Sequence, residues 1–434
     1  MPTPTASRIP RRRWGIGVLL GSGILVSFLD RINLAVAAPQ LQHEFRLDAV
    51  ALGYLFSAFS WTYAGLQIPV GLFVDRAGAT RVGRWGAFLW SIASAVTAVA
   101  GGFAGIFAAR MLLGVAEAPS FPVVSKATGH WFPRGERARA TAIFDASAKF
   151  SNVIGVPLIA FVVVRFGWRW GFGVTSAISF VYFLAFYLIY RDPSADTRLS
   201  REEHAHILSG GAMPEGAPGA SPVEMLGYLL RQRKVWGLAI GFGAYGYSFY
   251  LFLNWLPDYL VRSAGMGILK SAEYAAAPWA VATLTDLAVG GWLIDFLIAR
   301  GADETRTRKT VLVTGMMLGV AVIGATMTTD PAWAIFWISI SLGGLAAAAP
   351  VGWSLPSLIA PVGGVGAVGG IMNFAVNLMG IAAPIATGYI VRETHSFIGA
   401  FQAAAAILVV GILAFIFLLG RIENMPPPLA ARSG

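Results

Sequence analysis

Cysteine is absent from this 434-residue chain, and charged residues make up only 12% of it. The lack of cysteine excludes disulfide bonds and thiolate metal sites, and it leaves the redox compartment undetermined. Because roughly a quarter of the residues in soluble domains are charged, the low charge content excludes an ordinary soluble protein. Apolar residues make up 56% of the chain, a share that indicates a membrane protein.

Apolar runs long enough to cross a bilayer recur along the whole chain. The first run, from Trp14 to Ala38, follows three arginines, but its length and its internal charges distinguish it from a cleaved signal peptide. The runs cover residues 14–38, 50–74, 83–100, 103–128, 138–164, 170–190, 235–261, 273–299, 310–328, 332–360, 364–391 and 396–419. The sequence therefore predicts an all-α polytopic membrane protein with twelve transmembrane helices in two six-helix pseudo-repeats.

A long polar segment over residues 191–234 divides the runs into two sets of six. We expect an N-terminal half over residues 1–190, a cytoplasmic linker over 191–234 and a C-terminal half over 235–434. An internal repeat supports this division. The segments GLFVDRAGATR and GWLIDFLIARG begin at Gly71 and Gly291, 220 residues apart, and each follows the second run of its half.

Lysine and arginine are concentrated in alternate loops between the apolar runs, and the chain carries a net charge of +10. Because cytoplasmic loops of membrane proteins carry an excess of these residues, the asymmetry predicts that both termini are cytoplasmic. The basic residues lie in short loops between apolar runs. The lipid bilayer, and not nucleic acid, is therefore the expected partner.

The first run carries two charged residues, Asp30 and Arg31, into the hydrocarbon. A lone charge at the bilayer centre costs at least about 2.5–3.5 kcal/mol, so such residues normally face a bundle interior and mark a substrate or ion pathway. An inert internal ion pair is the alternative. Adjacent side chains point about 100° apart on a helix and cannot pair face to face, which disfavours that alternative.

The fourth run places an acid and a base on one helix face. Arg110, Gly114 and Glu117 are spaced i, i+4, i+7, and Pro119 and Pro122 follow where they would bend the helix. A desolvated carboxylate can carry a proton near neutral pH, and a nearby guanidinium keeps it charged until an anion competes for that guanidinium. A structural salt bridge is the alternative.

A polar stripe on the second run predicts a cavity-facing surface, because polar groups inside membrane helices usually avoid lipid. Its members are Phe56, Ser60, Tyr63 and Gln67. Helix–helix hydrogen bonding is the alternative for Ser60 and Gln67. Candidates for the opposite wall of a substrate site are Tyr247, Tyr250, Asn254, Trp353, Ser354, Asn373 and Asn377. For the tyrosines, a role in the core or at the lipid interface is equally open.

The loop after the second run carries a recognisable signature at Gly71, Asp75, Arg76, Gly78 and Arg81. In this loop the chain resembles the major facilitator superfamily. Five further blocks resemble the anion:cation symporter family, which includes D-galactonate, hexuronate and glucarate permeases. The blocks are FLDRINLAVAAPQL, GYLFSAFSWTYAGLQIPVG, RMLLGVAEAPSFP, HWFPRGERARATAIF and NWLPDYL.

The resemblance implies roles for four charged residues. In that family, the carboxylates that match Asp30 and Glu117 take up the coupled proton. The arginines that match Arg31 and Arg110 handle the substrate anion or pair with those acids. All four residue types are present in this sequence.

The resemblance also implies substrate contacts. A family tyrosine that binds the substrate carboxylate matches Tyr63, and Trp353 and Asn373 match further contacts. Two positions depart from the D-galactonate permease: Phe28 replaces a tyrosine, and Ala148–Lys149 replaces a glutamine. These departures argue against D-galactonate itself as the substrate.

Further charges suggest gating roles. In the repeated loop segments, Asp75 and Asp295 are expected to bond helix-end donors and loop arginines such as Arg76 and Arg81 on the cytoplasmic side.

Three intramembrane charges have no match in the family pattern. Asp145 and Lys149 are spaced i, i+4 on the fifth run, and Asp286 lies within the eighth. The fifth and eighth helices are neighbours in the superfamily, so Lys149 is a candidate to bridge Asp145 and Asp286. It would then contribute to gating or reach a second acidic group on the substrate. A purely local Asp145–Lys149 pair is the alternative.

The expected function is proton-coupled uptake of an organic carboxylate, a sugar acid or an aromatic acid, by alternating access across a bacterial inner membrane. Protons are the coupling ion, and no other cofactor, metal or enzymatic activity is expected. Neither a His-rich metal pattern nor a nucleophile elbow is found in the sequence. We expect a monomer. The alternative is a proton-coupled exporter of drugs or metabolites.

Overall fold

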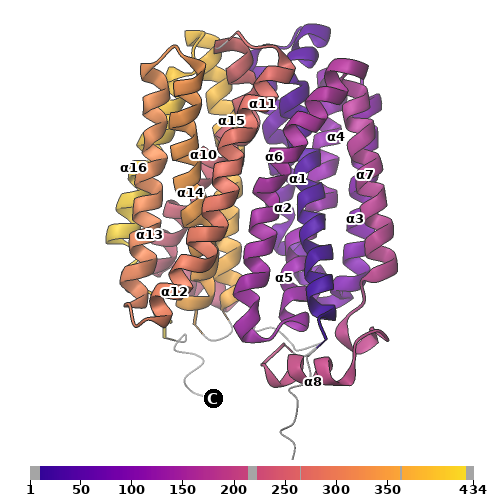
Figure 1. The fold of residues 1–434 in the computed structure, drawn as a ribbon, viewed down its shortest axis with the longest axis vertical. Helices are drawn as coiled ribbons and strands as arrows, with labels where there is room; N and C mark the ends of the chain where they lie inside the picture. The colour runs from indigo at the N-terminus through magenta and orange to yellow at the C-terminus, as the bar shows by residue number, and fades with distance from the viewer. Residues whose placement is uncertain (1–9, 214–221, 264, 362–363, 427–434) are drawn as a thin grey trace, which may run out of the picture.

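The computed structural model describes residues 10–213, 222–263, 265–361 and 364–426. Within these ranges the protein is helical and contains no strand, so the predicted all-α class is confirmed. Figure 1 shows two groups of long helices side by side, one built from the N-terminal part of the chain and one from the C-terminal part. The exact domain boundaries stay a prediction.

The N-terminal group contains seven α-helices in the described part of the chain. They are α1 (Arg12–Phe45), α2 (Ala49–Ala77), α3 (Ala79–Val99), α4 (Gly102–Glu117), α5 (Ser120–Trp131), α6 (Arg137–Phe166) and α7 (Trp168–Ile189). A short 3-10 turn, η1 (Arg134–Glu136), precedes α6. The linker contributes η2 (Pro193–Ala195), α8 (Arg201–Ser209) and α9 (Pro222–Leu229).

The C-terminal group follows the linker. Its α-helices are α10 (Arg233–Ser263), α11 (Ile268–Thr285), α12 (Ile294–Ala299), α13 (Glu304–Gly319), α14 (Pro331–Ile359), α15 (Val365–Thr394) and α16 (Ile398–Phe417). A π-helical segment, η3 (Asp286–Leu293), joins α11 to α12. A 3-10 segment, η4 (Val320–Met327), extends α13.

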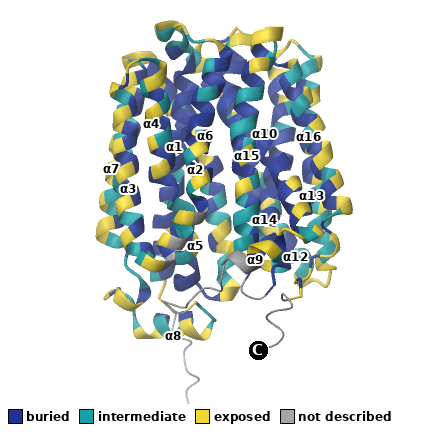
Figure 2. Cartoon of the chain, turned by 180° about the vertical axis from the view of Figure 1, so that it is seen from behind, coloured by how far each residue is buried: buried dark blue, intermediate teal, exposed yellow. Residues whose placement is uncertain are grey.

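In the described part of the chain, ten helical stretches are long and apolar enough to cross a membrane. With α3 and α10, which lie in the same bundle, they account for the twelve predicted runs. Figure 2 shows exposed positions along the outward sides of α3, α7, α13 and α16. Large apolar side chains among them include Trp85, Val99, Leu188, Met317 and Phe417. An apolar outer surface of this kind is what a lipid environment requires.

Two interruptions in the helices coincide with polar residues. The chain leaves α4 after Glu117, and Pro119 occupies the cap position of α5, as the predicted bend requires. In the C-terminal group, the π-helical segment starts at Asp286. Sequence periodicity did not predict this second interruption.

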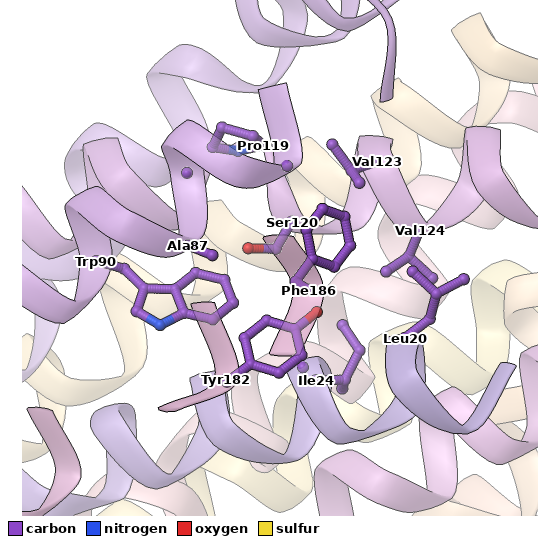
Figure 3. Close-up of a pocket in the computed structure, with 13 residues that line it drawn as sticks. Leu20, Ile24, Ala87, Trp90, Pro119, Ser120, Val123, Val124, Tyr182 and Phe186 are labelled. Carbon is purple, nitrogen blue, oxygen red and sulfur yellow. The ribbon is translucent and has the colours of Figure 1, made fainter. Parts of the chain in front are cut away.

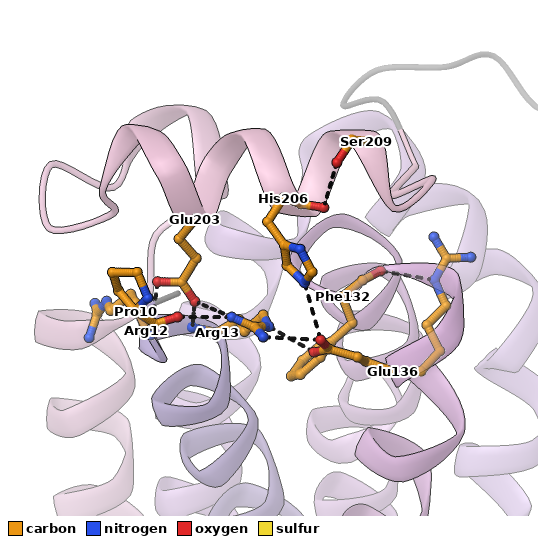
Figure 4. A network of polar contacts seen from close by, with 9 residues as sticks. Pro10, Arg12, Arg13, Phe132, Glu136, Glu203, His206 and Ser209 are labelled. Carbon is orange, nitrogen blue, oxygen red and sulfur yellow. Dashed lines mark hydrogen bonds and ion pairs between the residues drawn. The ribbon is translucent and has the colours of Figure 1, made fainter. Parts of the chain in front are cut away.

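Ion pairs hold the linker helix α8 against the N-terminal group (Figure 4). The guanidinium of Arg13 contacts Glu203 of α8 at 2.9 Å and Glu136 at 2.7 Å. His206 of α8 approaches the same Glu136 carboxylate at 3.2 Å. The Glu203 side chain is fully buried, so α8 is docked on the bundle. Figure 1 places α8 and the start of α1 at one end of the molecule.

The two groups meet closely along α2 and α15 near the end opposite α8. A Cβ atom on Gly53 would lie 2.6 Å from the carbonyl oxygen of Pro384, and one on Gly388 would lie 2.5 Å from that of Ala49. Only glycine allows backbones to approach this closely. We define these contacts as the glycine seam, which closes this end of the interface.

Candidate functional site

A buried ion pair joins α1 to α4 inside the N-terminal group. The Nε of Arg31 donates to Oε2 of Glu117 at 2.9 Å, and its Nη2 lies 2.8 Å from the same oxygen. The side chains are 5% and 0% exposed, respectively. Both charges are therefore held away from solvent, where a fixed opposite charge interacts far more strongly than in water.

Three aromatic rings surround the Arg31 guanidinium. Its central carbon lies 4.6 Å from the ring centroid of Phe28, 4.4 Å from that of Phe59 and 5.0 Å from that of Tyr63. Cation–π contacts at these distances favour the charged guanidinium and restrict its orientation. The predicted proximity of Arg31 and Tyr63 is present, and Phe59 is a neighbour that sequence reasoning missed.

Asp30 does not pair with the adjacent Arg31, in agreement with their helical spacing. Its two carboxylate oxygens accept hydrogen bonds from Ser94 at 2.7 Å and Ser179 at 2.6 Å. Arg110 donates to the backbone oxygen of Asp30 at 3.0 Å, and not to the carboxylate. Two hydroxyls thus hold a buried carboxylate that has no direct ion-pair partner within the described residues.

Arg110 and Glu117, the base and the acid of α4, do not pair with each other, although both are buried on one face of the helix. The ion-pair partner of Glu117 comes from α1. Between the two residues, Gly114 lets α4 approach α2, since a Cβ atom there would lie 2.3 Å from the backbone oxygen of Phe59. Among described residues, Nε of Arg110 and Oε1 of Glu117 have no hydrogen-bond partner. The site therefore retains one free donor and one free acceptor.

A second buried cluster spans the two groups. The Nζ of Lys149 on α6 lies 2.7 Å from Oδ2 of Asp145 on the same helix. It also contacts the carboxylate of Asp286, at the junction of α11 and η3. The predicted bridging geometry is present, and the purely local pair is not what the structure contains. The role of this cluster in gating or substrate binding stays a prediction.

Polar side chains link α2 to α15 of the C-terminal group. Nδ2 of Asn373 donates to Oε1 of Gln67 at 3.0 Å, and Nδ2 of Asn377 donates to Oδ1 of Asn373 at 3.0 Å. Tyr250 on α10 donates to Oδ1 of Asn377 at 3.1 Å. For Gln67, the structure thus contains the helix–helix hydrogen bond that the sequence left open.

The remaining candidates of the C-terminal wall are engaged in their own group. Tyr247 is buried, and Asn254 donates to the backbone oxygen of Tyr250 at 2.9 Å. The ring of Trp353 packs edge-on against Phe242 at 4.9 Å. Ser354 accepts a hydrogen bond from Arg308 at 3.2 Å, a basic partner that sequence reasoning missed. Their contribution to substrate binding stays a prediction.

The proposed gating loop is described only in part. Gly78 connects α2 to α3 with a φ of 84°, a conformation that favours glycine. The side chains of Arg76 and Arg81 are exposed. Those of Asp75 and Asp295 lie outside the described residues, so their contacts stay a prediction.

A separate apolar pocket lies within the N-terminal group (Figure 3). Its labelled lining residues come from α1, α3, α5 and α7 and from the turn before α5: Leu20, Ile24, Ala87, Trp90, Pro119, Ser120, Val123, Val124, Tyr182 and Phe186. None of these side chains is charged. An anion would find no countercharge there, so the buried charge clusters are the better candidates for function. Within the described ranges, no group of three His, Asp or Glu side chains is placed to hold a metal ion.

Comparison with known proteins identifies the family. A family model described as Major Facilitator Superfamily matches residues 20–302. The chain belongs to the major facilitator superfamily. It is thus a multi-pass membrane transporter and not an enzyme, and the twelve-helix fold class that the sequence predicted is confirmed.

Several relatives are similar over almost their whole length. The chain is 39% identical to the uncharacterized transporter YybO of Bacillus subtilis, covering 95% of each protein. It is 30% identical to a D-galactonate transporter of Escherichia coli, covering 97% of this chain and 98% of that one. It is 33% identical to the probable galactarate/D-glucarate transporter GarP of Escherichia coli, covering 92% and 93%. These names agree with the resemblance to the anion:cation symporter family.

The solved structures support the fold. A bacterial homologue of the human lysosomal transporter Spinster, in an inward-facing and unoccupied conformation, superposes with a TM-score of 0.68. The sequences are 18% identical, and the match covers 95% of this chain and 96% of the other. At this identity the likeness establishes the arrangement of helices and nothing about substrate.

Proposed function

We propose that this transporter carries an organic carboxylate inward together with protons, by alternating access. The observation that carries the proposal is the Arg31–Glu117 ion pair, enclosed by aromatic rings in the membrane interior. A guanidinium presents a planar fork that matches a carboxylate with two parallel hydrogen bonds. In the structure, one carboxylate oxygen of Glu117 lies between Nε and Nη2 of this fork.

Proton and substrate binding are linked through this exchange. When Glu117 takes up a proton, its negative charge is lost and its hold on Arg31 weakens. The guanidinium then binds the carboxylate of the substrate, so that no uncompensated charge is left in the bilayer. After release of substrate on the other side, loss of the proton restores the ion pair. In this cycle, binding of the anion without the proton, or of the proton without the anion, is disfavoured.

Asp30 is proposed as the second protonation site. Its carboxylate rests on the hydroxyls of Ser94 and Ser179, and the Arg110 side chain binds the adjacent backbone oxygen. A buried carboxylate with hydroxyl partners can be ionised or neutral without breaking an ion pair. The Arg110 guanidinium, which keeps a free Nε, would sense the charge of Asp30 and supply a further contact to the anion.

The names of the relatives support an acidic sugar as the substrate class, since they specify D-galactonate and galactarate or D-glucarate. We further propose that the protein is a monomer in a bacterial inner membrane with both termini cytoplasmic. The end that carries α8 would then be the cytoplasmic end.

The test uses purified protein in sealed liposomes. A thermal-shift screen against sugar acids, aromatic acids and dicarboxylates should first identify ligands, because binding to the native state raises apparent stability. An inward proton gradient should then drive accumulation of the stabilising acid, and an uncoupler should abolish it. Export of the acid against an inward proton flux would favour the exporter instead. No stabilisation and no accumulation with any acid would contradict the proposal.

A further inference from the structure

The Lys149 cluster, formed by Asp145, Lys149 and Asp286, contains more acid than base. One ammonium lies between two carboxylates, one from its own helix and one from the opposite group. Lys149 is 2% exposed and Asp286 is fully buried, whereas the Asp145 side chain keeps 15% of its surface exposed. If both acids are ionised, the cluster carries a net negative charge inside the membrane.

No further ion pair reaches the cluster from the other described residues. Tyr245 on α10 is the further titratable side chain that interacts with Lys149. The segment Pro331–Ile359, which forms α14 and packs against η3, contains no acidic, basic or histidine residue. A proton on one of the two acids is therefore the local means of balancing the charge.

The geometry selects Asp286 as the acid that takes up the proton. Its carboxylate oxygens make no hydrogen bond within the described residues, so Lys149 is the one partner that stabilises its charge. Asp145 reaches partial solvent exposure and precedes the lysine by one helical turn, an arrangement that favours their pairing. Complete burial disfavours the ionised form of a carboxylate, and Asp286 is the fully buried acid of the cluster.

The backbone at Asp286 is also unusual. The π-helical segment begins at this residue, and π-helical turns are rare and occur frequently at functional sites. Two glycines in the segment bring it close to its neighbours. A Cβ atom on Gly290 would lie 2.4 Å from Pro350 of α14, and one on Gly291 would lie 3.5 Å from the Cβ of Ala142 on α6. A shift at Asp286 would therefore change the contact between α6 and η3.

We propose that Asp286 is a proton-binding site that controls the contact between α6 of one half and η3 of the other. When Asp286 is ionised, Lys149 bridges the halves. When a proton binds the Asp286 carboxylate, the ammonium stays protonated and remains with Asp145, and the ion pair between the halves is lost. A proton bound there would accompany the opening of this contact, in addition to any proton on Asp30 or Glu117.

Cysteine cross-linking tests this inference without any substrate. The chain contains no cysteine, so Ala142→Cys with Gly291→Cys introduces one unique thiol pair. The 3.5 Å separation of the Cβ positions suits a disulfide. The control pair is Gly21→Cys with Ser147→Cys inside the N-terminal group, where a Cβ on Gly21 would lie 3.2 Å from the serine oxygen. This control corrects for the pH dependence of thiol oxidation.

Relative to the control pair, cross-linking between positions 142 and 291 should fall several-fold on acidification. Adding Asp286→Asn should give low cross-linking at every pH, because the amide mimics the protonated acid. Adding Asp145→Asn should keep cross-linking high down to lower pH, because Asp286 is then the one carboxylate of the cluster that can pair with Lys149. Cross-linking that follows the control pair at all pH values, or a pH dependence that survives Asp286→Asn, would overturn the inference.

Infrared difference spectroscopy supplies an independent measurement on the cysteine-free protein, in case the thiol variants fold poorly. Acidification should produce a carbonyl band of a protonated buried carboxyl group that is missing in Asp286→Asn and retained in Asp145→Asn. An unchanged band in Asp286→Asn would overturn the assignment of the proton to this residue. Both experiments are performed on ligand-free protein, so their outcome is separate from that of the transport assays.

Discussion

Asn373 of α15 donates a hydrogen bond of 3.0 Å to Gln67 of α2, and this bond joins the two halves of the transporter. Asn377 fixes the orientation of the Asn373 amide by donating to its Oδ1. In the alternating access that we propose, the halves move relative to each other, and we expect this bond to break during each cycle.

The Gln67–Asn373 bond allows a double-mutant cycle. Gln67→Leu and Asn373→Leu should each change stability by about 1 kcal/mol, and the double variant should show a clear coupling energy. If Asn373 also contacts substrate, its variant should lose additional affinity that Gln67→Leu does not lose. Unfolding measurements and ligand titrations on the same four proteins check both points. Strict additivity would show that the bond does not contribute to stability.

Replacement of Arg31 by lysine should weaken binding of the substrate carboxylate by about tenfold or more, the equivalent of about 1.4 kcal/mol or more. A lysine keeps the charge, but it lacks the planar fork and the stacking between aromatic rings. Calorimetric titration with the acid identified by thermal shift measures the effect. Arg165→Lys, at an exposed position of α6, is the matched control. Equal affinity of Arg31→Lys and wild type would move the anion site elsewhere.

Asp30→Asn and Glu117→Gln should each abolish accumulation driven by a proton gradient. Exchange of labelled for unlabelled substrate should survive better, because exchange can cycle without proton release. Uptake and exchange are measured in the same liposomes. Glu44→Gln makes the same chemical change at a carboxylate that is 39% exposed and pairs with Arg169, and it should leave accumulation intact. Gradient-driven accumulation by both site variants at the wild-type level would refute the assignment.

Removal of the lysine from the Lys149 cluster should stop transport. Lys149→Ala leaves the buried Asp286 and the half-buried Asp145 without a cation, and an uncompensated buried charge typically costs about 3–5 kcal/mol. Adding Asp286→Asn should restore part of the stability and of the transport activity if the residues are coupled. Thermal unfolding and uptake assays on the single and double variants measure the coupling. Restoration by Asp145→Asn alone would indicate a local pair, and full activity of Lys149→Ala would remove the cluster from the mechanism.

Widening of the glycine seam should oppose closure at the end that we propose faces outward. A Cβ on Gly388 would meet the backbone oxygen of Ala49 at 2.5 Å, so Gly388→Ala should cost about 1–3 kcal/mol and slow transport. Gly366→Ala on the same helix is the control, because no atom lies within 4 Å of its Cβ position. Uptake rates and unfolding temperatures are measured for both variants. If the two substitutions change the uptake rate and the unfolding temperature equally, the close backbone approach at the glycine seam does not affect transport or stability.

Sequence reasoning predicted the general architecture well, because long apolar runs report directly on membrane crossing. It also predicted the bridging position of Lys149, because the superfamily places the fifth and eighth helices side by side. It left open which of the two arginines, Arg31 or Arg110, pairs with Glu117. A spacing of i, i+7 shows that Arg110 and Glu117 share a face, but the helix that packs against that face determines that Arg31 supplies the ion pair.

Other parts of the site depend on details that single-residue patterns do not contain. Ser94 and Ser179, which bind Asp30, each stand among other serines and threonines of an apolar run, and many of those hydroxyls only bond their own helix. The one available signal was that these polar side chains lie in apolar runs of a chain that also carries a charged residue, Asp30, in its first apolar run. The π-helical segment at Asp286 packs against α6 and α14, and periodicity alone cannot report contacts with such distant parts of the chain.

The linker is divided between the two halves. Helix α8 is held to the N-terminal half by Arg13 and Glu136, whereas Tyr228 of α9 donates to the backbone of Pro426 at 2.6 Å and so belongs with the C-terminal half. The two halves therefore carry their own parts of the linker, so α8 should move with the N-terminal half and α9 with the C-terminal half whenever the halves change their relative position.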